Sequence, residues 1–217
     1  MTTTIEARPN AAPTRGVARL AGLCFMIAGI AFTVGGASHP SDSGTGNKVK
    51  QLHDMLVDSS WYPSHAALLL AMILFAIGLF GLRKRADLAP GVERLLDIAF
   101  VIACVAVVSM GVHLGTALDA ESVADGHQSL VSRIETVSEA IDAVWALALA
   151  ALALAGGVTR TIGNRIALAF GVAGGVAFAL ASATIPYTDT FDPLFKGGSL
   201  LAIWAIIVGV IELRRPV

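Results

Sequence analysis

The chain has 217 residues, of which 55% are hydrophobic and 14% are charged, and its formal net charge at pH 7 is −1. Soluble domains carry about 25% charged residues, so this composition excludes an ordinary water-soluble domain. The small net charge provides no field that would attract nucleic acid, which we do not expect as a partner. Cys24 and Cys104 both lie in apolar runs without a CxxC spacing, so thiol–disulfide chemistry is not expected either.

Six apolar runs follow one another along the chain. A membrane-spanning helix needs roughly 20 apolar residues; four runs meet this length comfortably, and the second and sixth are near the short limit. Lipid forces a spanning segment to pair its backbone internally. The sequence therefore predicts an all-α polytopic membrane bundle with the lipid bilayer as a partner. The predicted spans lie near residues 17–38, 65–82, 95–117, 140–158, 166–185 and 198–213.

The basic residues are distributed unevenly between the two sides of this predicted bundle. Eleven of the fifteen Lys and Arg residues lie before the first run, after the last, or in the second and fourth connections. By the positive-inside rule, both termini are predicted to be cytoplasmic. The excess of Arg over Lys and the abundant Ala favour a bacterial plasma membrane. Residues 1–14 are predicted to form a disordered cytoplasmic tail, and 15–217 a single six-helix transmembrane domain.

The connections on the opposite side contain helical patterns of their own. Apolar residues on one face predict a short interfacial helix within residues 47–58. The fourth membrane helix is predicted to begin near Ser129 and to stand above the membrane. Residues 19–40 and 165–186 both run from Arg to Pro with seven identical positions. This similarity suggests an internal repeat. If the repeat is real, the bundle consists of three in–out–in hairpins.

Small residues crowd the fourth and fifth runs. Gly171 and Gly175 form a GxxxG spacing, which permits close approach of two helices. Tight packing within the chain is the favoured interpretation, and a homodimer interface is the alternative.

Four ionisable residues are predicted to share one depth at the outer membrane boundary. Counting 18–20 positions from the basic residues at the cytoplasmic boundary covers about 27–30 Å of helix. That distance matches the hydrocarbon thickness. The count reaches His39, His65, His113 and Asp142. Trp61 and Tyr62, immediately before His65, are predicted to form an interfacial aromatic anchor.

Three histidines and a carboxylate on separate helices are a candidate metal site. Imidazole is the commonest metal ligand in proteins, so we predict His39, His65, His113 and Asp142 as ligands of copper or zinc. Met110 lies three residues before His113 on the same helical face and could add a soft ligand. Two of the histidines could instead hold a haem iron. The alternative for each histidine alone is an interfacial side chain that reaches headgroup water.

The remaining charges in the spans are interpreted structurally. Asp97 is expected to pair with Arg94 three residues earlier, and Glu212 is expected to face water. We find no charge near the middle of any span, which argues against a proton-coupled pump or ion channel. No HExxH motif is present, so the pattern favours a binding role over an enzyme.

Short motifs in the first third of the chain carry a resemblance. The dipeptide HP at 39–40, the pattern WxxxH at 61–65 and the run GLFGL at 78–82 resemble small, uncharacterised six-helix bacterial integral membrane proteins. The resemblance covers mainly residues 17–85. It implies the six-helix architecture and no particular chemistry.

Three functional readings follow from the sequence. The first is a membrane binding or accessory protein with an outward-facing histidine cluster for a metal or haem. The second is a structural or assembly subunit that docks other membrane subunits. The third is a transporter or enzyme for a lipophilic molecule, which predicts a lateral opening and a bound lipid or quinone near Trp145.

Overall fold

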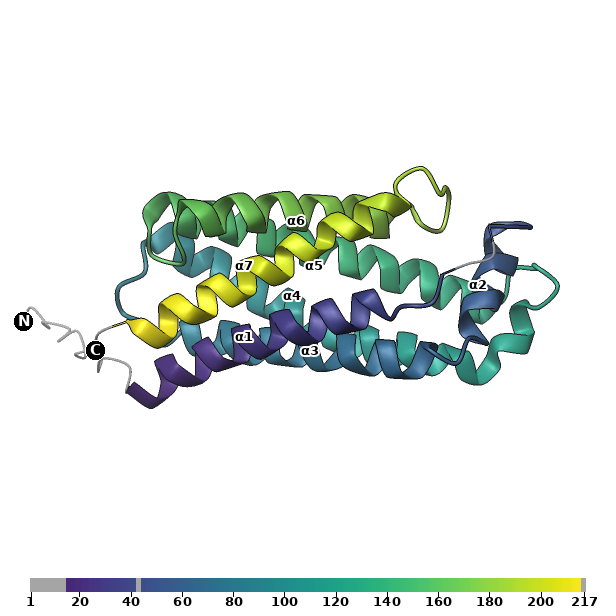
Figure 1. Ribbon diagram of the computed structural model, residues 1–217, viewed down its shortest axis with the longest axis horizontal. Helices are drawn as coiled ribbons and strands as arrows, with labels where there is room; N and C mark the ends of the chain where they lie inside the picture. The colour runs from purple at the N-terminus through teal and green to yellow at the C-terminus, as the bar shows by residue number, and fades with distance from the viewer. Residues whose placement is uncertain (1–14, 42–43, 216–217) are drawn as a thin grey trace, which may run out of the picture.

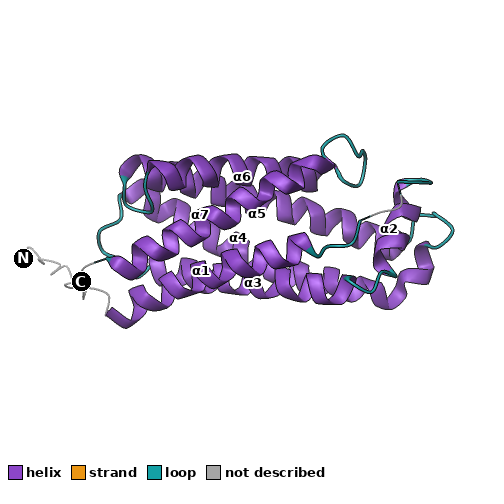
Figure 2. Cartoon of the chain, viewed as in Figure 1, coloured by secondary structure: helices purple, strands orange, loops and turns teal. Residues whose placement is uncertain are grey.

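The computed structural model describes residues 15–41 and 44–215, and the predicted tail 1–14 lies outside them. This part of the chain is helical and contains no strand (Figure 2). Among the described residues, six helices are long and apolar enough to cross a membrane, so the predicted six-helix membrane bundle is confirmed. Its long helices are α1 (Arg15–Ala37), α3 (Trp61–Leu82), α4 (Pro90–Gly115), α5 (Leu130–Thr159), α6 (Arg165–Thr184) and α7 (Phe195–Arg214).

The six long helices form a closed ring in chain order. Each packs against the one before and the one after it, and α7 closes the ring against α1. The described chain begins and ends at one end of the bundle, which we call the terminal end (Figure 1). The short helix α2 (Lys48–Leu56) lies at the other end, the α2 end, where it contacts the 3-10 helix η1 (Thr116–Val123). A second 3-10 turn, η2 (Asp192–Leu194), precedes α7.

Local sequence explains how the helices at the α2 end begin. Asn47 caps α2 by accepting a hydrogen bond from the Lys50 backbone N–H. Ser129 caps α5 in a capping box with Ser132, so the predicted start of this helix near Ser129 is confirmed. At 30 residues, α5 is about 45 Å long, which exceeds a hydrocarbon core of about 30 Å.

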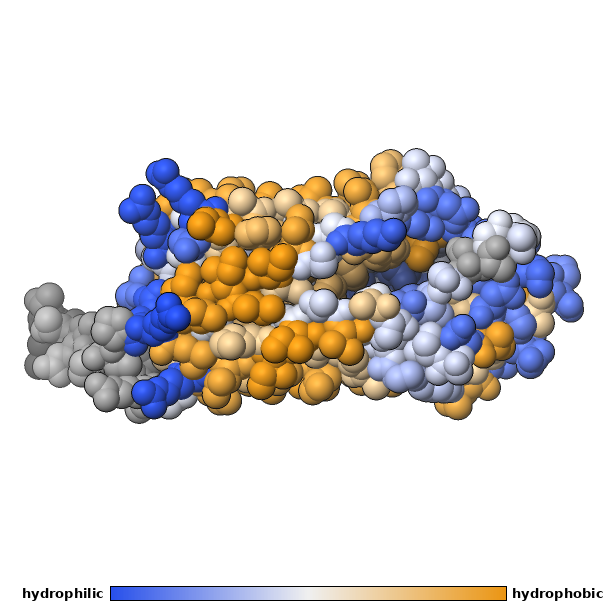
Figure 3. Space-filling view, viewed as in Figure 1, coloured by the Kyte–Doolittle hydropathy of each residue, from blue (hydrophilic) through white to orange (hydrophobic). Residues whose placement is uncertain are grey.

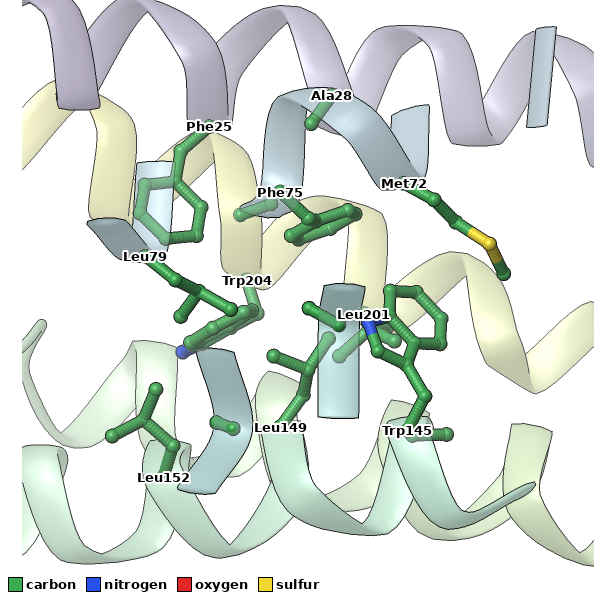
Figure 4. Close-up of a cluster of buried hydrophobic side chains, with 14 of the residues drawn as sticks. Phe25, Ala28, Met72, Phe75, Leu79, Trp145, Leu149, Leu152, Leu201 and Trp204 are labelled. Carbon is green, nitrogen blue, oxygen red and sulfur yellow. The ribbon is translucent and has the colours of Figure 1, made fainter. Parts of the chain in front are cut away.

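Aromatic and small residues fill the interior of the ring. Phe25, Phe75, Trp145 and Trp204 are fully buried and meet edge to face, with ring centroids 5.4–5.9 Å apart in three of the pairs (Figure 4). Such edge-to-face contacts add to the energy of burial. Trp145 therefore lies in a packed core. The third functional hypothesis predicted a bound lipid or quinone near this residue.

Close helix contacts depend on glycine. A Cβ atom on Gly171 would lie 2.4 Å from the Ala153 side chain, and one on Gly175 would lie 2.7 Å from the Ala146 carbonyl oxygen. Both glycines therefore face α5, and the GxxxG spacing serves packing within the chain.

The terminal end contains a network of ion pairs that the sequence interpretation missed. Arg85 is buried, and its Nη1 lies 2.9 Å from Oε1 of Glu212, which is also buried. The expectation that Glu212 faces water is therefore wrong. Asp87 accepts hydrogen bonds from Arg85 and from Arg215. We call Arg85, Asp87, Glu212 and Arg215 the terminal ion-pair network.

A second ion pair near this end also differs from its prediction. Asp97 Oδ1 accepts a hydrogen bond of 2.6 Å from Arg83 Nε, so its partner is on α3 and not Arg94 on its own helix. Neighbouring helices in the ring bring these two residues together, which spacing along one helix could not indicate.

The surface divides into three zones. Figure 3 shows an apolar belt around the middle of the bundle between hydrophilic ends. Exposed Leu, Ile and Val side chains such as Val101, Val108 and Ile166 contribute to this belt. An apolar belt of this kind is the surface that lipid contacts, so the chain is a multi-pass membrane protein.

Candidate metal centre

Three helices that are consecutive in the ring bring three histidines together at the α2 end. His39 lies just beyond α1, His65 in the second turn of α3, and His113 in the last turn of α4. The ring centroids of His39 and His65 are 4.7 Å apart, and those of His65 and His113 are 4.8 Å apart. The side chains of His65 and His113 are buried, and His39 is exposed. The three histidines, which the sequence places at one membrane depth, therefore also lie next to one another in the bundle.

Trp61 supports the two buried imidazoles. Helix α3 begins at Trp61, four residues earlier than predicted, so Trp61 and His65 lie one turn apart on the same face. The Trp61 ring stacks on His65 at 3.8 Å between centroids and on His113 at 5.1 Å. Its Nε1 donates to the Leu114 carbonyl oxygen. Trp61 is buried, so its predicted role as an interfacial anchor is wrong, whereas Tyr62 is exposed.

The three histidines share one pattern of contacts at Nδ1. His39 Nδ1 donates to the Pro40 carbonyl oxygen at 2.8 Å, and His65 Nδ1 donates to the Trp61 carbonyl oxygen at 2.7 Å. His113 Nδ1 lies 2.5 Å from Oε2 of Glu135, an ion-pair contact without hydrogen-bond geometry. A neutral imidazole whose Nδ1 carries the hydrogen presents Nε2 as a lone pair. His65 Nε2 is buried and has no hydrogen-bond partner among the described residues.

Acidic side chains on α5 face these rings. Glu135, Glu139 and Asp142 follow one another at spacings of four and three, which places them on one helical face. Each is close enough to His113 to interact with it electrostatically. Glu135 and Asp142 are buried, and Glu139 is half-buried. Glu135 Oε1 and Asp142 Oδ1 have no hydrogen-bond partner in the described part of the chain.

We call His39, His65, His113, Glu135, Glu139 and Asp142 the histidine–acid cluster. Sequence reasoning missed Glu135, although its helical spacing to Asp142 was readable. Ionised carboxylates are acceptors only. The cluster gathers carboxylate oxygens and imidazole nitrogens at one place in the bundle, several of them without a hydrogen-bond partner in the described residues.

A cavity of about 80 Å³ adjoins the cluster. His39, His113, Glu135 and Glu139 line one side of it, and α2 residues including Lys48 line another. A water molecule occupies about 30 Å³ in the liquid, so the cavity can hold an ion with a few waters. Ligand pockets for larger organic molecules occupy about 300–1,000 Å³. This size argues against the haem alternative in the arrangement seen.

The structure separates the predicted ligands into two groups. His39, His65 and His113 meet at neighbouring rings, whereas Asp142 lies two turns beyond Glu135 along α5. Neither His65 nor Asp142 lines the cavity. Met110 is buried in the apolar core and does not line the cavity either. In residues 15–41 and 44–215, no three His, Cys, Asp or Glu side chains are arranged to close on a metal ion as they stand.

Comparison with known proteins adds no assignment. No protein-family model matches the chain, and neither do the curated proteins or solved structures. The resemblance carried by the HP, WxxxH and GLFGL motifs stays a prediction.

Proposed function

We propose that this membrane protein binds one divalent transition-metal ion, best matched by zinc, through Nε2 of His39, His65 and His113. The supporting observation is the common Nδ1 pattern. Metal-binding histidines usually donate their other ring N–H to a carbonyl or carboxylate, which fixes the ring and leaves Nε2 for the metal. His39 and His65 donate Nδ1–H to the Pro40 and Trp61 carbonyl oxygens, and Glu135 Oε2 lies 2.5 Å from His113 Nδ1, where a small rotation would make the third bond.

The spacing of the rings supports this ligand set. With zinc–nitrogen bonds of 2.0–2.1 Å and a tetrahedral angle, two imidazoles on one ion have centroids roughly 5 Å apart. Two of the three ring pairs meet this spacing, at 4.7 Å for His39–His65 and 4.8 Å for His65–His113. As the rings stand, no three of these side chains close on one ion, so binding requires the imidazoles to reorient. Water, or Asp142 after rotation, would occupy the fourth position.

Each remaining part of the cluster has a separate role in this proposal. Glu135 orients His113 and increases the basicity of its ring. Trp61 keeps the His65 and His113 rings in place by stacking on them. The carboxylates of Glu139 and Asp142 add negative charge that attracts a cation. Zinc with nitrogen ligands is a Lewis acid when bound, and we assign it capture or structural cross-linking and no reaction.

The proposal includes the membrane orientation. The excess of basic residues at the terminal end supports cytoplasmic termini in a bacterial plasma membrane, by the positive-inside rule. The histidine–acid cluster at the α2 end would then face the extracytoplasmic side and take its ion from there.

The test is zinc titration of the detergent-purified protein by calorimetry, after treatment with a chelator. We expect one zinc per chain, loss of binding in His65→Ala, and binding weakened 10- to 100-fold in Glu135→Gln. His127→Ala is the matched control, because His127 is an exposed histidine in the loop that precedes α5. No zinc uptake by a folded protein, or equal uptake in His65→Ala, would contradict the proposal.

A further inference from the structure

An apolar groove lies between α3 and α4 on the lipid-facing side of the bundle, away from the histidine–acid cluster. Ile73, Ile77 and Phe80 line it from α3, and Phe100 and Cys104 line it from α4. Its volume is about 370 Å³, which falls within the range of ligand pockets. The positions from Ile73 to Phe80 extend about 10 Å along the helix axis. The groove can therefore hold part of one acyl chain.

Two aromatic rings and two basic side chains close the groove toward the terminal end. The Phe80 and Phe100 rings have centroids 5.8 Å apart. The Lys84 ammonium lies 4.7 Å from the Phe80 ring centroid, and the Arg83 guanidinium lies 4.8 Å from that of Phe100. Positive charge thus lies over the rings at the groove's end, at the depth predicted for lipid headgroups.

The charges around this end leave an excess of positive charge. Asp97 pairs with Arg83 through the 2.6 Å hydrogen bond. Glu93 lies one helical turn before Asp97 on α4. Asp97 offsets the charge of Arg83, so Lys84 supplies the positive charge at the groove's end. In the described part of the chain, Lys84 has no ion-pair partner within 4.0 Å.

We propose that the α3–α4 groove binds one anionic phospholipid. Its acyl chain would lie along Ile73, Ile77 and Cys104, and its phosphate would accept hydrogen bonds from Lys84 and Arg83. Basic residues at the headgroup end of a groove between membrane helices attract anionic headgroups, and charge-assisted hydrogen bonds to phosphate are stronger than neutral ones. This site is independent of the proposed metal centre.

The test is native mass spectrometry of the full chain, after equilibration with vesicles of equal amounts of phosphatidylglycerol and phosphatidylcholine with identical acyl chains. We expect one retained phosphatidylglycerol per chain, in clear excess over phosphatidylcholine. Lys84→Ala should reduce this retention about fivefold, and Lys84→Arg should restore it. Cys104→Phe should also reduce it, because Cys104 is exposed and the added ring would fill the groove.

Arg165→Ala is the matched control, because Arg165 is an exposed basic residue at the same end, on α6. It should keep the wild-type retention. Equal retention of both lipids would overturn the proposal, and so would an unchanged phosphatidylglycerol signal in Lys84→Ala. Circular dichroism of each variant shows whether it is folded. If Lys84→Ala does not fold, Cys104→Phe supplies the test, and wild-type retention in that variant would overturn the proposal.

Discussion

Both ends of the bundle bury charged side chains, but they differ in how those charges are matched. At the terminal end, Arg85 and Glu212 are opposite charges at 2.9 Å, and Asp87 and Arg215 complete the network. At the α2 end, three carboxylates on one face of α5 meet imidazoles. Within the described residues, the buried polar atoms without a hydrogen-bond partner include several of this cluster and one oxygen of Glu212 at the terminal end.

This difference separates a structural role from a binding role. A matched buried pair is costly to break, because removal of one partner leaves an uncompensated charge. A buried polar group without a partner lowers stability unless something binds it. The terminal end therefore stabilises the bundle, and the α2 end is where we propose that a cation binds.

The largest effect is expected at the terminal end. Glu212→Ala leaves Arg85 buried without its partner, and we expect a loss of about 3–5 kcal/mol in the free energy of unfolding. Denaturant titration in detergent micelles measures this loss. Glu93→Ala, at an exposed position near the same end, should change stability little. An equal small effect in both variants would show that the Arg85–Glu212 pair is not stabilising.

The next effect should come from zinc itself. Zinc at about 100 times its dissociation constant should stabilise the folded chain by about 2.7 kcal/mol. For a chain of this size that corresponds to about 5–10 °C in Tm. Thermal unfolding followed by circular dichroism measures the shift. His65→Ala should lose the shift and His127→Ala should keep it; a shift that persists in His65→Ala would place the ion elsewhere.

A smaller effect of opposite sign is expected for an acid of the histidine–acid cluster. Asp142→Asn removes one of three neighbouring carboxylates without changing the shape of the side chain. We expect the zinc-free protein to gain about 1 kcal/mol in stability, because like charges at close range repel. The same unfolding titration compares it with Glu212→Gln, which should lose stability. A loss of stability in Asp142→Asn would mean that the negative charges on α5 are already balanced by positive charge within the chain.

The smallest expected effect concerns Asp87, which is largely exposed. Hydrogen bonds from Arg85 lower the pKa of the Asp87 carboxyl. A lowered folded-state pKa contributes stability above the unfolded value of about 3.9, and this stability is lost as pH falls through the folded pKa. Asp87→Asn should cost less than about 1 kcal/mol at pH 7. The cost should shrink as the pH falls below about 3.9 and through the lowered pKa of Asp87 in the folded chain, and urea titrations of the wild-type chain and of Asp87→Asn over this pH range measure it.

Hydrophobic length predicted the six spanning helices, because backbone pairing in lipid leaves few alternatives. Counting residues along helices predicted the level of His39, His65 and His113. It could not predict that they meet, since depth carries no information about which helices are neighbours. The ring order α1, α3, α4 supplies that information.

The errors have the same physical origin. Spacing along one helix predicts Arg94 as the partner of Asp97, but its partner is Arg83 on α3. It predicts that Glu212 faces water, but Glu212 pairs with Arg85. Trp61 was assigned to the membrane interface because Trp is common there, but the earlier start of α3 turns it onto His65. Contacts between helices depend on packing across the ring, which one-dimensional spacing does not report.

The most direct test of the metal centre is X-ray absorption at the zinc edge, on the purified chain loaded with one equivalent of zinc. The account predicts three imidazole nitrogens at about 2.0–2.1 Å from the ion, and two in His65→Ala if any zinc remains bound. Zinc surrounded only by water and carboxylate oxygens, or an identical spectrum in His65→Ala, would contradict it.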